Sequence, residues 1–205
     1  MFKKFVLKED VASNTALKSS AQRSIRSKLL EQMPVLSQPI NNLNQTSDGP
    51  TDPTGGDENQ LSLIESIWPK KETLYLLKCR EHISILVCKG LPLFFQRFDE
   101  AYFPTLRLVH QYPTLLPQVQ VDRGAIKFVL SGANIMCPGL TSPGASLPDQ
   151  LATNTPVSVL AEGKQHACAI GFTQMSSIDM RKINKGIGVD NIHYLGDDLW
   201  AIESI

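Results

Sequence analysis

The stretch VDRGAIKFVLSGANIMCPGL, which runs from Val121 to Leu140, carries the densest structural signal in the chain. Asp122 can cap a short helix over Gly124–Leu130. Gly132 can close that helix, because glycine adopts left-handed backbone conformations without a steric cost. Asn134–Cys137 then begins a run of strands. A short helix that leads into strands favours an α+β fold.

The sequence after this stretch predicts more short strands. Strand candidates lie at Pro156–Ala161, at Ala167–Thr173 and around Asn191–Leu195, with a helix at Ser176–Asn184 before the last of them. Several short strands in so few residues suit a small closed or nearly closed barrel.

The sequence before Val121 predicts a separate domain. Ser13-Asn14 can cap a helix that runs to about Met33, where Pro34 stops it. Further expected elements are a short helix from Leu61 to Trp68, an antiparallel meander over Leu74–Cys79, Ile83–Cys88 and Leu91–Phe98, and a helix from Pro104 through Tyr112. Pro113 and Pro117 mark the expected boundary. We therefore predict an N-terminal α/β domain with an antiparallel sheet over residues 1–116 and a barrel domain over residues 117–205.

Residues 45–60 interrupt the N-terminal domain with a segment of different composition. The segment is rich in Gly, Pro, Asp and Thr and contains no apolar side chain. It cannot contribute to a hydrophobic core, so we expect a flexible insertion.

The composition is that of an ordinary globular protein. Hydrophobic residues make up 42% of the 205 residues and charged residues 20%. No apolar run is long enough to cross a bilayer, and the first residues lack the apolar stretch of a secretory signal. The four cysteines form no Cys-x-x-Cys pair, which favours reduced thiols and hence a cytoplasmic protein with no membrane contact.

The net charge of zero hides an uneven distribution along the chain. Residues 1–44 carry 7 basic and 3 acidic side chains, residues 45–60 carry 0 and 4, residues 61–116 carry 7 and 5, and residues 117–205 carry 6 and 8. The N-terminal half can therefore attract phosphates, for example through Arg23, Arg26 and Lys28, although such charges also occur on ordinary solvated helix faces. The C-terminal half would have to bind RNA through local geometry.

The Val121–Leu140 stretch resembles the signature of PUA domains, small pseudo-barrels that bind structured RNA. The resemblance continues through the motifs AEGKQHA at Ala161–Ala167, NKGIG at Asn184–Gly188, NIHYL at Asn191–Leu195, MFKKF at Met1–Phe5, PTLRL at Pro104–Leu108 and LTSPGA at Leu140–Ala145. With these motifs, nearly the whole chain is similar to the malignant T-cell-amplified sequence family. Residues 45–60 depart from the compact pattern of that family.

The resemblance implies a non-enzymatic RNA-binding translation factor. Members of the family pair with density-regulated protein in a heterodimer that acts on the 40S ribosomal subunit. The pair promotes release of deacylated tRNA, recycling after termination and reinitiation. The implied RNA partners are ribosomal RNA and the tRNA acceptor end.

The same stretch supplies candidate RNA-binding residues. They are Arg123, Lys127, Gly132, Ala133, Asn134, Gly139, Lys164 and Lys185. Lys127 lies one helical turn from Arg123, so both charges can face one side beside the glycine loop. Glycines at 132 and 139 can turn the chain and let backbone N–H groups approach a phosphate. The alternative, that Gly132, Ala133, Met136, Pro138 and Gly139 only shape and pack the barrel, stays open.

Other chemistries have weaker support. Cys79, His82 and Cys88 invite a zinc interpretation, but no fourth ligand has suitable spacing, so we expect core thiols and a surface histidine. Lys185–Gly188 lacks the third glycine of a dinucleotide fingerprint and is interpreted as a helix C-cap. We find no recognisable catalytic arrangement and predict no metal and no cofactor.

Two other functions remain as alternatives. One is an RNA-modification or ribosome-biogenesis protein that uses the PUA domain to dock structured RNA; the first 116 residues contain no catalytic motif in its support. The other is a scaffold whose barrel binds only protein, which RNA binding by the C-terminal half would contradict.

Overall fold

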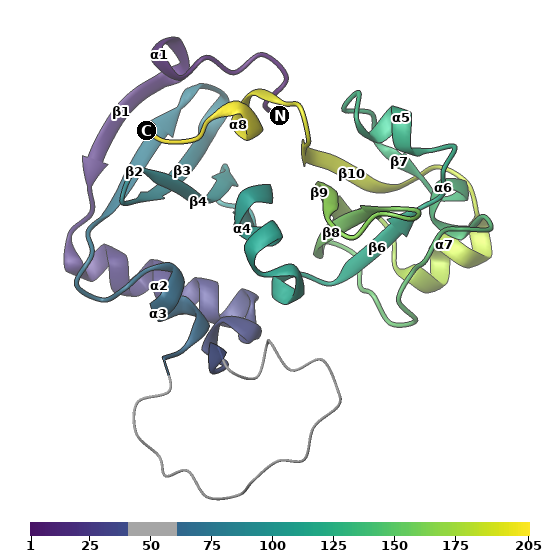
Figure 1. The fold of residues 1–205 in the computed structure, drawn as a ribbon, viewed down its shortest axis with the longest axis horizontal. Coiled ribbons are helices and arrows are strands. Elements are labelled where there is room, and N and C mark those ends of the chain that lie inside the picture. Colours follow the sequence, from purple (N-terminus) through teal and green to yellow (C-terminus); the bar gives the residue numbers. More distant parts are fainter. Residues whose placement is uncertain (41–60) are drawn as a thin grey trace, which may run out of the picture.

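The computed structural model describes residues 1–40 and 61–205, which form two five-stranded sheets that lie side by side (Figure 1). The predicted insertion at 45–60 lies outside the described residues. The helices are α1 (Leu7–Asp10), α2 (Ser19–Gln32), α3 (Leu63–Ile67), α4 (Leu106–Gln111), α5 (Ile126–Val129), α6 (Pro138–Thr141), α7 (Ser177–Ile183) and α8 (Asp198–Ala201). The strands are β1 (Val11–Ala16), β2 (Leu74–Cys79), β3 (Ile83–Cys88), β4 (Leu91–Arg97), β5 (Phe103–Pro104), β6 (Gln118–Val121), β7 (Ile135–Met136), β8 (Pro156–Ala161), β9 (Ala167–Thr173) and β10 (Ile187–Tyr194).

The first sheet is antiparallel in the order β1-β2-β3-β4-β5, which confirms the predicted α+β class. Its centre is the predicted meander, with Leu74 opposite Cys88 and Ile83 opposite Arg97. Helices α2 and α3 lie below the sheet in Figure 1, and α4 lies between the two sheets. Helix α3 keeps the predicted position but spans only Leu63–Ile67.

The predicted start of the first long helix is wrong. Ser13 and Asn14 lie in strand β1, where Asn14 pairs with Leu77 of β2. Helix α2 begins only at Ser19 and ends before Met33, as expected. Pairing along the sheet edge outweighs the capping tendency of Ser13 and Asn14, because it satisfies the backbone groups of a whole strand.

The predicted start of the helix before Tyr112 is also shifted. Pro104 belongs to strand β5, and Thr105 is the N-cap of α4, where its side chain accepts a hydrogen bond from the Leu108 backbone N–H. A cap with a hydroxyl satisfies a free N–H of the first turn, which proline cannot do.

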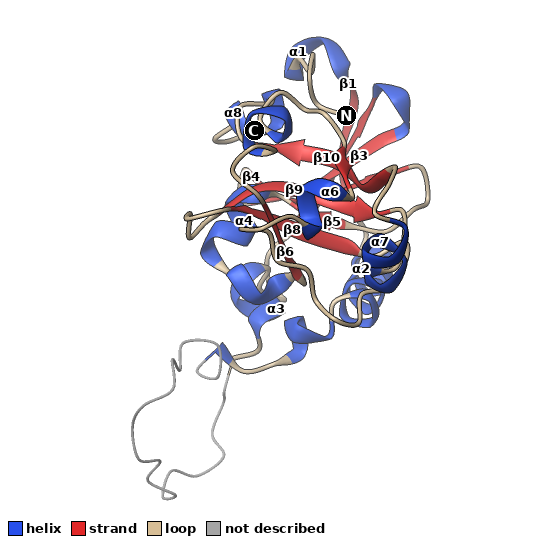
Figure 2. Cartoon of the chain, turned by 90° about the vertical axis from the view of Figure 1, so that its right-hand side faces the viewer, coloured by secondary structure: helices blue, strands red, loops and turns tan. Residues whose placement is uncertain are grey.

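The second sheet has the order β6-β8-β9-β10-β7 and curls into a half-barrel. Strand β6, which the sequence interpretation missed, pairs in parallel with β8. Strand β10 begins at Ile187, before the predicted Asn191, because Ile187 already pairs with Met136 of β7. The interpretation of Lys185–Gly188 as a helix C-cap is therefore wrong, since Gly188 lies in β10 and Asn184 caps the helix. Helix α7 has the predicted position, with Ser176 as N-cap and Asn184 in the left-handed conformation as C-cap. Figure 2 shows the strands crossing the middle of the molecule with helices around them.

The hydrophobic core of the first sheet extends to the second sheet, which also has a core of its own. Phe2 packs edge-on against Phe95 of β4 and His193 of β10, and Phe103 packs against Phe172 of β9. The C-terminal residue also contacts the first sheet, since the Ile205 N–H donates to the Gly90 carbonyl at 2.8 Å. None of the helices in the described ranges combines the length and the apolar character that crossing a bilayer requires.

Candidate nucleic-acid interface

A cavity of about 520 Å³ opens between α5 and the segment that contains β7 and α6. Its lining residues are Asp122, Gly124, Ala125, Phe128, Val129, Ala133, Asn134, Ile135, Met136, Pro138, Gly139 and Ser142. Four of the eight candidate residues therefore touch it or flank it directly: Gly132, Ala133, Asn134 and Gly139. Its volume lies within the usual range for sites that take a small molecule or a single nucleotide.

Asp122 forms hydrogen bonds to residues on both sides of the cavity. The Asp122 carboxylate accepts a hydrogen bond from the Ala125 N–H at 2.9 Å, and the Asp122 N–H donates to the Gly139 carbonyl at 3.1 Å. A Cβ atom at Gly139 would lie 3.1 Å from the Ala125 Cβ. Gly139 thus allows the two walls of the cavity to approach each other.

Gly132 lies close to the ring of Tyr194. Its φ is +82°, and an added Cβ would lie 2.7 Å from Cε1 of the Tyr194 ring. The Asn191 side chain donates to the carbonyls of Val129 and Ala133, at 2.9 and 3.1 Å, and Asn134 accepts from the Asn191 N–H at 3.0 Å. Gly132 and Asn134 therefore fix the loop onto β10.

The cavity wall is apolar and exposed to solvent. Phe128 is 54% exposed and Met136 is 49% exposed, whereas Cys137 is fully buried. Ala133 is also exposed, so the side chains of Ala133 and Met136 do not lie in the barrel core. Exposed aromatic and thioether groups can stack on a nucleobase.

The cationic side chains lie around the rim, in an arrangement that differs from the predicted one. Helix α5 begins at Ile126, so Arg123 lies in the preceding turn and does not share a helix face with Lys127. Arg123 binds Glu162, with its N–H 2.8 Å from Oε2 and its guanidinium 3.8 Å from Oε1. The Lys127 ammonium lies 4.9 Å from the centroid of the Phe128 ring. Lys127 therefore places a positive charge directly beside the exposed aromatic group.

Lys164 and Lys185 lie on two further sides of this region. Lys164 is exposed in the turn after Glu162, the residue that binds Arg123. The Lys185 carbonyl accepts a weak hydrogen bond from the Cys137 thiol at 3.5 Å, which places exposed Lys185 next to the Met136 end of the cavity. Ala133, Asn134 and Gly139 therefore line the cavity, whereas Lys164 follows β8 and Lys185 precedes β10, at opposite ends of the second sheet.

The sequence interpretation missed Phe128, Leu130 and Met136 as surface residues. The available signal was the unbroken apolar run Phe128-Val129-Leu130, because one face of a short helix cannot bury three consecutive side chains besides Ile126. Of these four, only Val129 is fully buried.

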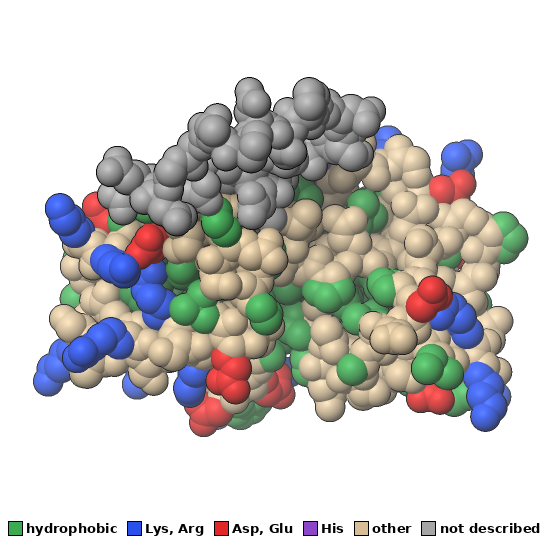
Figure 3. Space-filling model, turned by 90° about the horizontal axis from the view of Figure 1, so that it is seen from below, with side chains coloured by type: hydrophobic (Ala, Val, Ile, Leu, Met, Phe, Trp, Pro, Cys, Tyr) green, Lys and Arg blue, Asp and Glu red, His purple; other side chains and the backbone are tan. Residues whose placement is uncertain are grey.

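The basic helix α2 offers fewer free charges than its sequence indicates. The Arg26 guanidinium lies 4.2 Å from the Trp68 ring centroid and donates to the Trp68 carbonyl at 2.7 Å, so it serves the fold. Arg23 and Lys28 remain exposed. On the face seen in Figure 3, Lys and Arg gather mainly towards the two ends of the molecule.

The thiols of the weak zinc motif lie in the core. Cys79 and Cys88 are buried and His82 is exposed, as expected from the sequence. Burial raises the pKa of the Cys79 thiol to about 11. Within residues 1–40 and 61–205, no group of three or more His, Cys, Asp or Glu side chains could hold a metal ion.

Comparisons with known proteins identify both halves of the chain. A PUA domain model matches residues 117–195, and a Pre-PUA-like domain model matches residues 5–49 and 58–113. Malignant T-cell-amplified sequence 1-B of Xenopus laevis and malignant T-cell-amplified sequence 2 of Homo sapiens are each 47% identical over 204 residues, covering 100% of this chain and 99% of the relative. Translation machinery-associated protein 20 of Eremothecium gossypii is 48% identical over 202 residues, covering 98% and 97%.

Solved structures share the same fold at lower sequence identity. A hypothetical protein of Pyrococcus horikoshii is 20% identical, with a TM-score of 0.66 and coverage of 93% of this chain and 99% of the other. A conserved PUA domain protein of Thermoplasma acidophilum is 18% identical, with a TM-score of 0.57 and coverage of 92% and 98%. These two similarities describe the fold alone.

Proposed function

Because the chain belongs to the malignant T-cell-amplified sequence family, we propose that it is a non-enzymatic RNA-binding protein of the translation machinery. The name of the Eremothecium gossypii relative, translation machinery-associated protein 20, supports this assignment. The match covers nearly all of both chains, so the proposal concerns the whole protein.

In the finer form of the proposal, the protein acts in the cytoplasm on the 40S subunit as a heterodimer with density-regulated protein. There it promotes release of deacylated tRNA, recycling after termination and reinitiation. This finer proposal is supported by the resemblance of the motifs along the chain to those of the family.

The observation that carries the proposal is the exposed apolar cavity with cations on its rim. A protein that recognises RNA ends or loops needs a surface for an unstacked base and charges for the adjoining phosphates. Phe128 and Met136 offer the apolar surface, and Lys127 lies next to Phe128. A tRNA acceptor end, which is single-stranded, has the chemistry that this arrangement fits.

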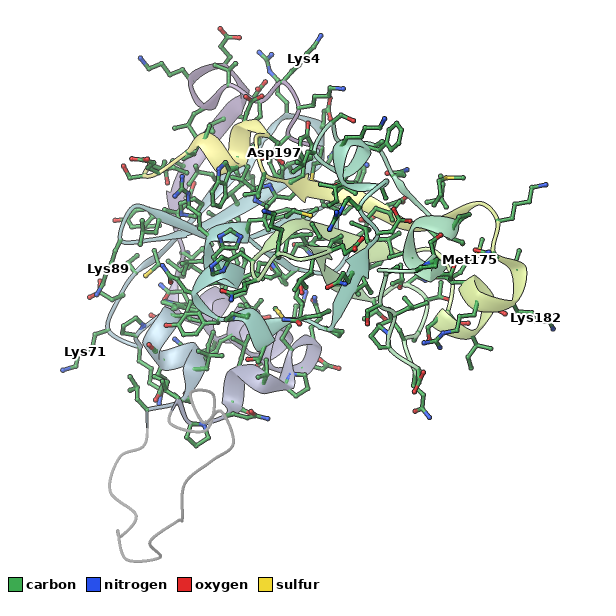
Figure 4. All side chains as sticks on the ribbon, turned by 45° about the vertical axis from the view of Figure 1, so that its right-hand side comes forward. Lys4, Lys71, Lys89, Met175, Lys182 and Asp197 are labelled. Carbon is green, nitrogen blue, oxygen red and sulfur yellow. The ribbon has the colours of Figure 1, made fainter. Side chains whose placement is uncertain are left out.

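The decisive experiment changes Lys127 to Glu. The substitution replaces attraction to phosphate by repulsion, so we expect affinity for 40S subunits or tRNA to fall about tenfold. Lys127 is exposed, and thermal stability and association with density-regulated protein should stay unchanged. Lys71→Glu is the matched control, because Lys71 is an exposed lysine of the first domain, remote from the cavity (Figure 4).

Affinity can be measured with purified 40S subunits and with deacylated tRNA at one fixed salt concentration. Equal affinity for the wild type and Lys127→Glu, with both proteins folded, would remove Lys127 from the interface. The absence of 40S and tRNA binding by the wild type, with or without density-regulated protein, would refute the proposed function itself.

A further inference from the structure

A second aromatic surface lies at the opposite half of the molecule, at one end of the first sheet. The 3-10 turn Arg80–His82 joins β2 to β3, and Phe98 directly follows β4. The Phe98 N–H donates to the His82 carbonyl at 2.9 Å, and the two rings stack with centroids 4.7 Å apart and planes 22° apart. Phe98 is 50% exposed and His82 is exposed, so both rings reach the surface.

The backbone holds these rings in an unfavourable conformation. Glu81, His82 and Phe98 have φ values of +56°, +58° and +52°, in the left-handed region that favours glycine. Positive φ is usual in the turn of a β-hairpin, and the bond from the Phe98 N–H to the His82 carbonyl fixes Phe98 beside this turn.

Positive charge surrounds the ring pair. The Arg97 guanidinium lies 5.4 Å from the Phe98 ring centroid. A cavity of about 420 Å³ shares Arg80 and Glu81 with the turn, and its lining also contains Met1, Lys3, Lys4, Phe5, Asp10 and Ile83. The cations in the lining are the Met1 amine, Lys3, Lys4 and Arg80, against the carboxylates of Asp10 and Glu81.

One of the two carboxylates is already engaged by the fold. Asp10 accepts a hydrogen bond from the Val6 N–H at 2.7 Å and lies 3.7 Å from Arg80. The side chain of Lys4 extends away from the ribbon into solvent (Figure 4). Lys3 and Lys4 line the cavity that begins at Arg80 and Glu81, the two residues that precede His82 in the turn.

We propose that the His82–Phe98 stack and the adjoining Lys3, Lys4, Arg80 and Arg97 form a second RNA contact, which takes an unpaired nucleotide. Its base stacks on the exposed face of Phe98, and its phosphates meet the lysines. The cations of the lining outnumber its carboxylates, which favours a ligand that carries phosphates. Base stacking on an aromatic ring beside cations is the usual means of binding single-stranded nucleic acid. The inference rests on the proposed RNA-binding function and adds a contact in the other domain.

The test uses the full chain and a fluorescently labelled single-stranded RNA of ten nucleotides, with affinity measured by anisotropy at fixed salt. We expect Phe98→Leu to weaken binding about tenfold, because leucine keeps an apolar side chain but has no ring for stacking. Phe98→Tyr keeps the ring and should bind like the wild type. Lys4→Glu should weaken binding several-fold, and the control Lys71→Glu should leave it unchanged.

A second measurement separates ligand binding from folding. Glycine adopts the left-handed conformation of Phe98 without strain, so Phe98→Gly should melt at the wild-type temperature or above while it loses RNA affinity. A clear fall in melting temperature for Phe98→Gly would indicate that Phe98 serves the fold, and would overturn the proposal.

The Lys127→Glu variant distinguishes this inference from the proposed function. If Lys127→Glu weakens RNA binding and Phe98→Leu does not, the protein binds RNA but not at Phe98, and the inference is overturned. The same holds if Phe98→Leu leaves RNA affinity intact and weakens association with density-regulated protein, since the ring would then contact protein. If the wild type binds neither the oligonucleotide nor 40S subunits, the proposed function fails first.

Discussion

Substitution of Gly132 by alanine tests whether this glycine serves the fold or the ligand. The new Cβ would lie 2.7, 2.8 and 2.9 Å from Cε1, Cζ and Oη of Tyr194, all shorter than any normal contact. Displacement of that largely buried ring should cost about 1–3 kcal/mol, as for other overpacked sites. The φ of +82° adds about 1–2 kcal/mol for a residue with a Cβ. We therefore expect Gly132→Ala to lower the free energy of unfolding by roughly 2–5 kcal/mol.

Gly163 supplies a matched control for this experiment. Its φ is +75°, but a Cβ at that position would meet no atom within 4 Å. Gly163→Ala should therefore show the backbone cost alone, about 1 kcal/mol. Equilibrium unfolding in urea, followed by circular dichroism, gives both free energies of unfolding, and the difference between them measures the contact with Tyr194.

Equal destabilisation by Gly132→Ala and Gly163→Ala would refute the argument from the Tyr194 contact. In a Tyr194→Leu background, which lacks the three ring atoms, the excess cost of Gly132→Ala should largely disappear. Loss of RNA binding by Gly132→Ala with unchanged stability would instead favour the close approach of a phosphate to this glycine.

Three further substitutions address stability elsewhere. Burial raises the pKa of the Cys168 thiol to about 11, so between about pH 9 and 11 the unfolded chain gives up a proton that the folded chain keeps. The free energy of unfolding should therefore fall with rising pH in this window. In Cys168→Ala this fall should be shallower by up to about 1.4 kcal/mol per pH unit. Chemical denaturation at a series of pH values measures both slopes, and identical slopes for the wild type and the variant would contradict the prediction. Asp197→Ala removes the acceptor of the Tyr194 and Trp200 N–H groups and the buried partner of His193, and should cost at least about 3 kcal/mol in urea unfolding. Thr105→Ala removes the N-cap of α4 and should cost about 1 kcal/mol, whereas Thr105→Ser should retain most of the stability.

The sequence predicted those elements whose signals are local. The meander from Leu74 to Arg97 and helix α7 with its Ser176 cap follow from alternation, turn residues and capping alone. Strand β1 did not, because its side chains are mostly exposed and its partner β2 lies far along the chain. Its strand state depends on a long-range pairing that no local pattern encodes.

The sequence named residues near the cavity but not its exposed apolar side chains. Gly124 and Gly139 line the cavity, Gly132 flanks it, and Lys127 lies beside Phe128. The exposure of Phe128 and Met136 depends on how far α5 extends, and the contact of Gly132 with Tyr194 depends on the approach of β10. Similarly, Phe98 follows two buried phenylalanines in sequence and is exposed only because β4 ends at Arg97.

The hydrogen bond from the Phe5 N–H to the Asp198 carboxylate joins residues 193 positions apart and has a consequence for synthesis on the ribosome. The Met1–Phe5 segment, which contains the fully buried Phe2, cannot complete its packing until Asp198 has been synthesised and has left the exit tunnel. At about 5–20 residues per second, this apolar segment stays unprotected for roughly 10–40 s while the intervening residues are made. A chaperone that binds nascent apolar segments would compete with folding during this interval, and removal of residues 198–205 would leave the Phe5 N–H without its acceptor.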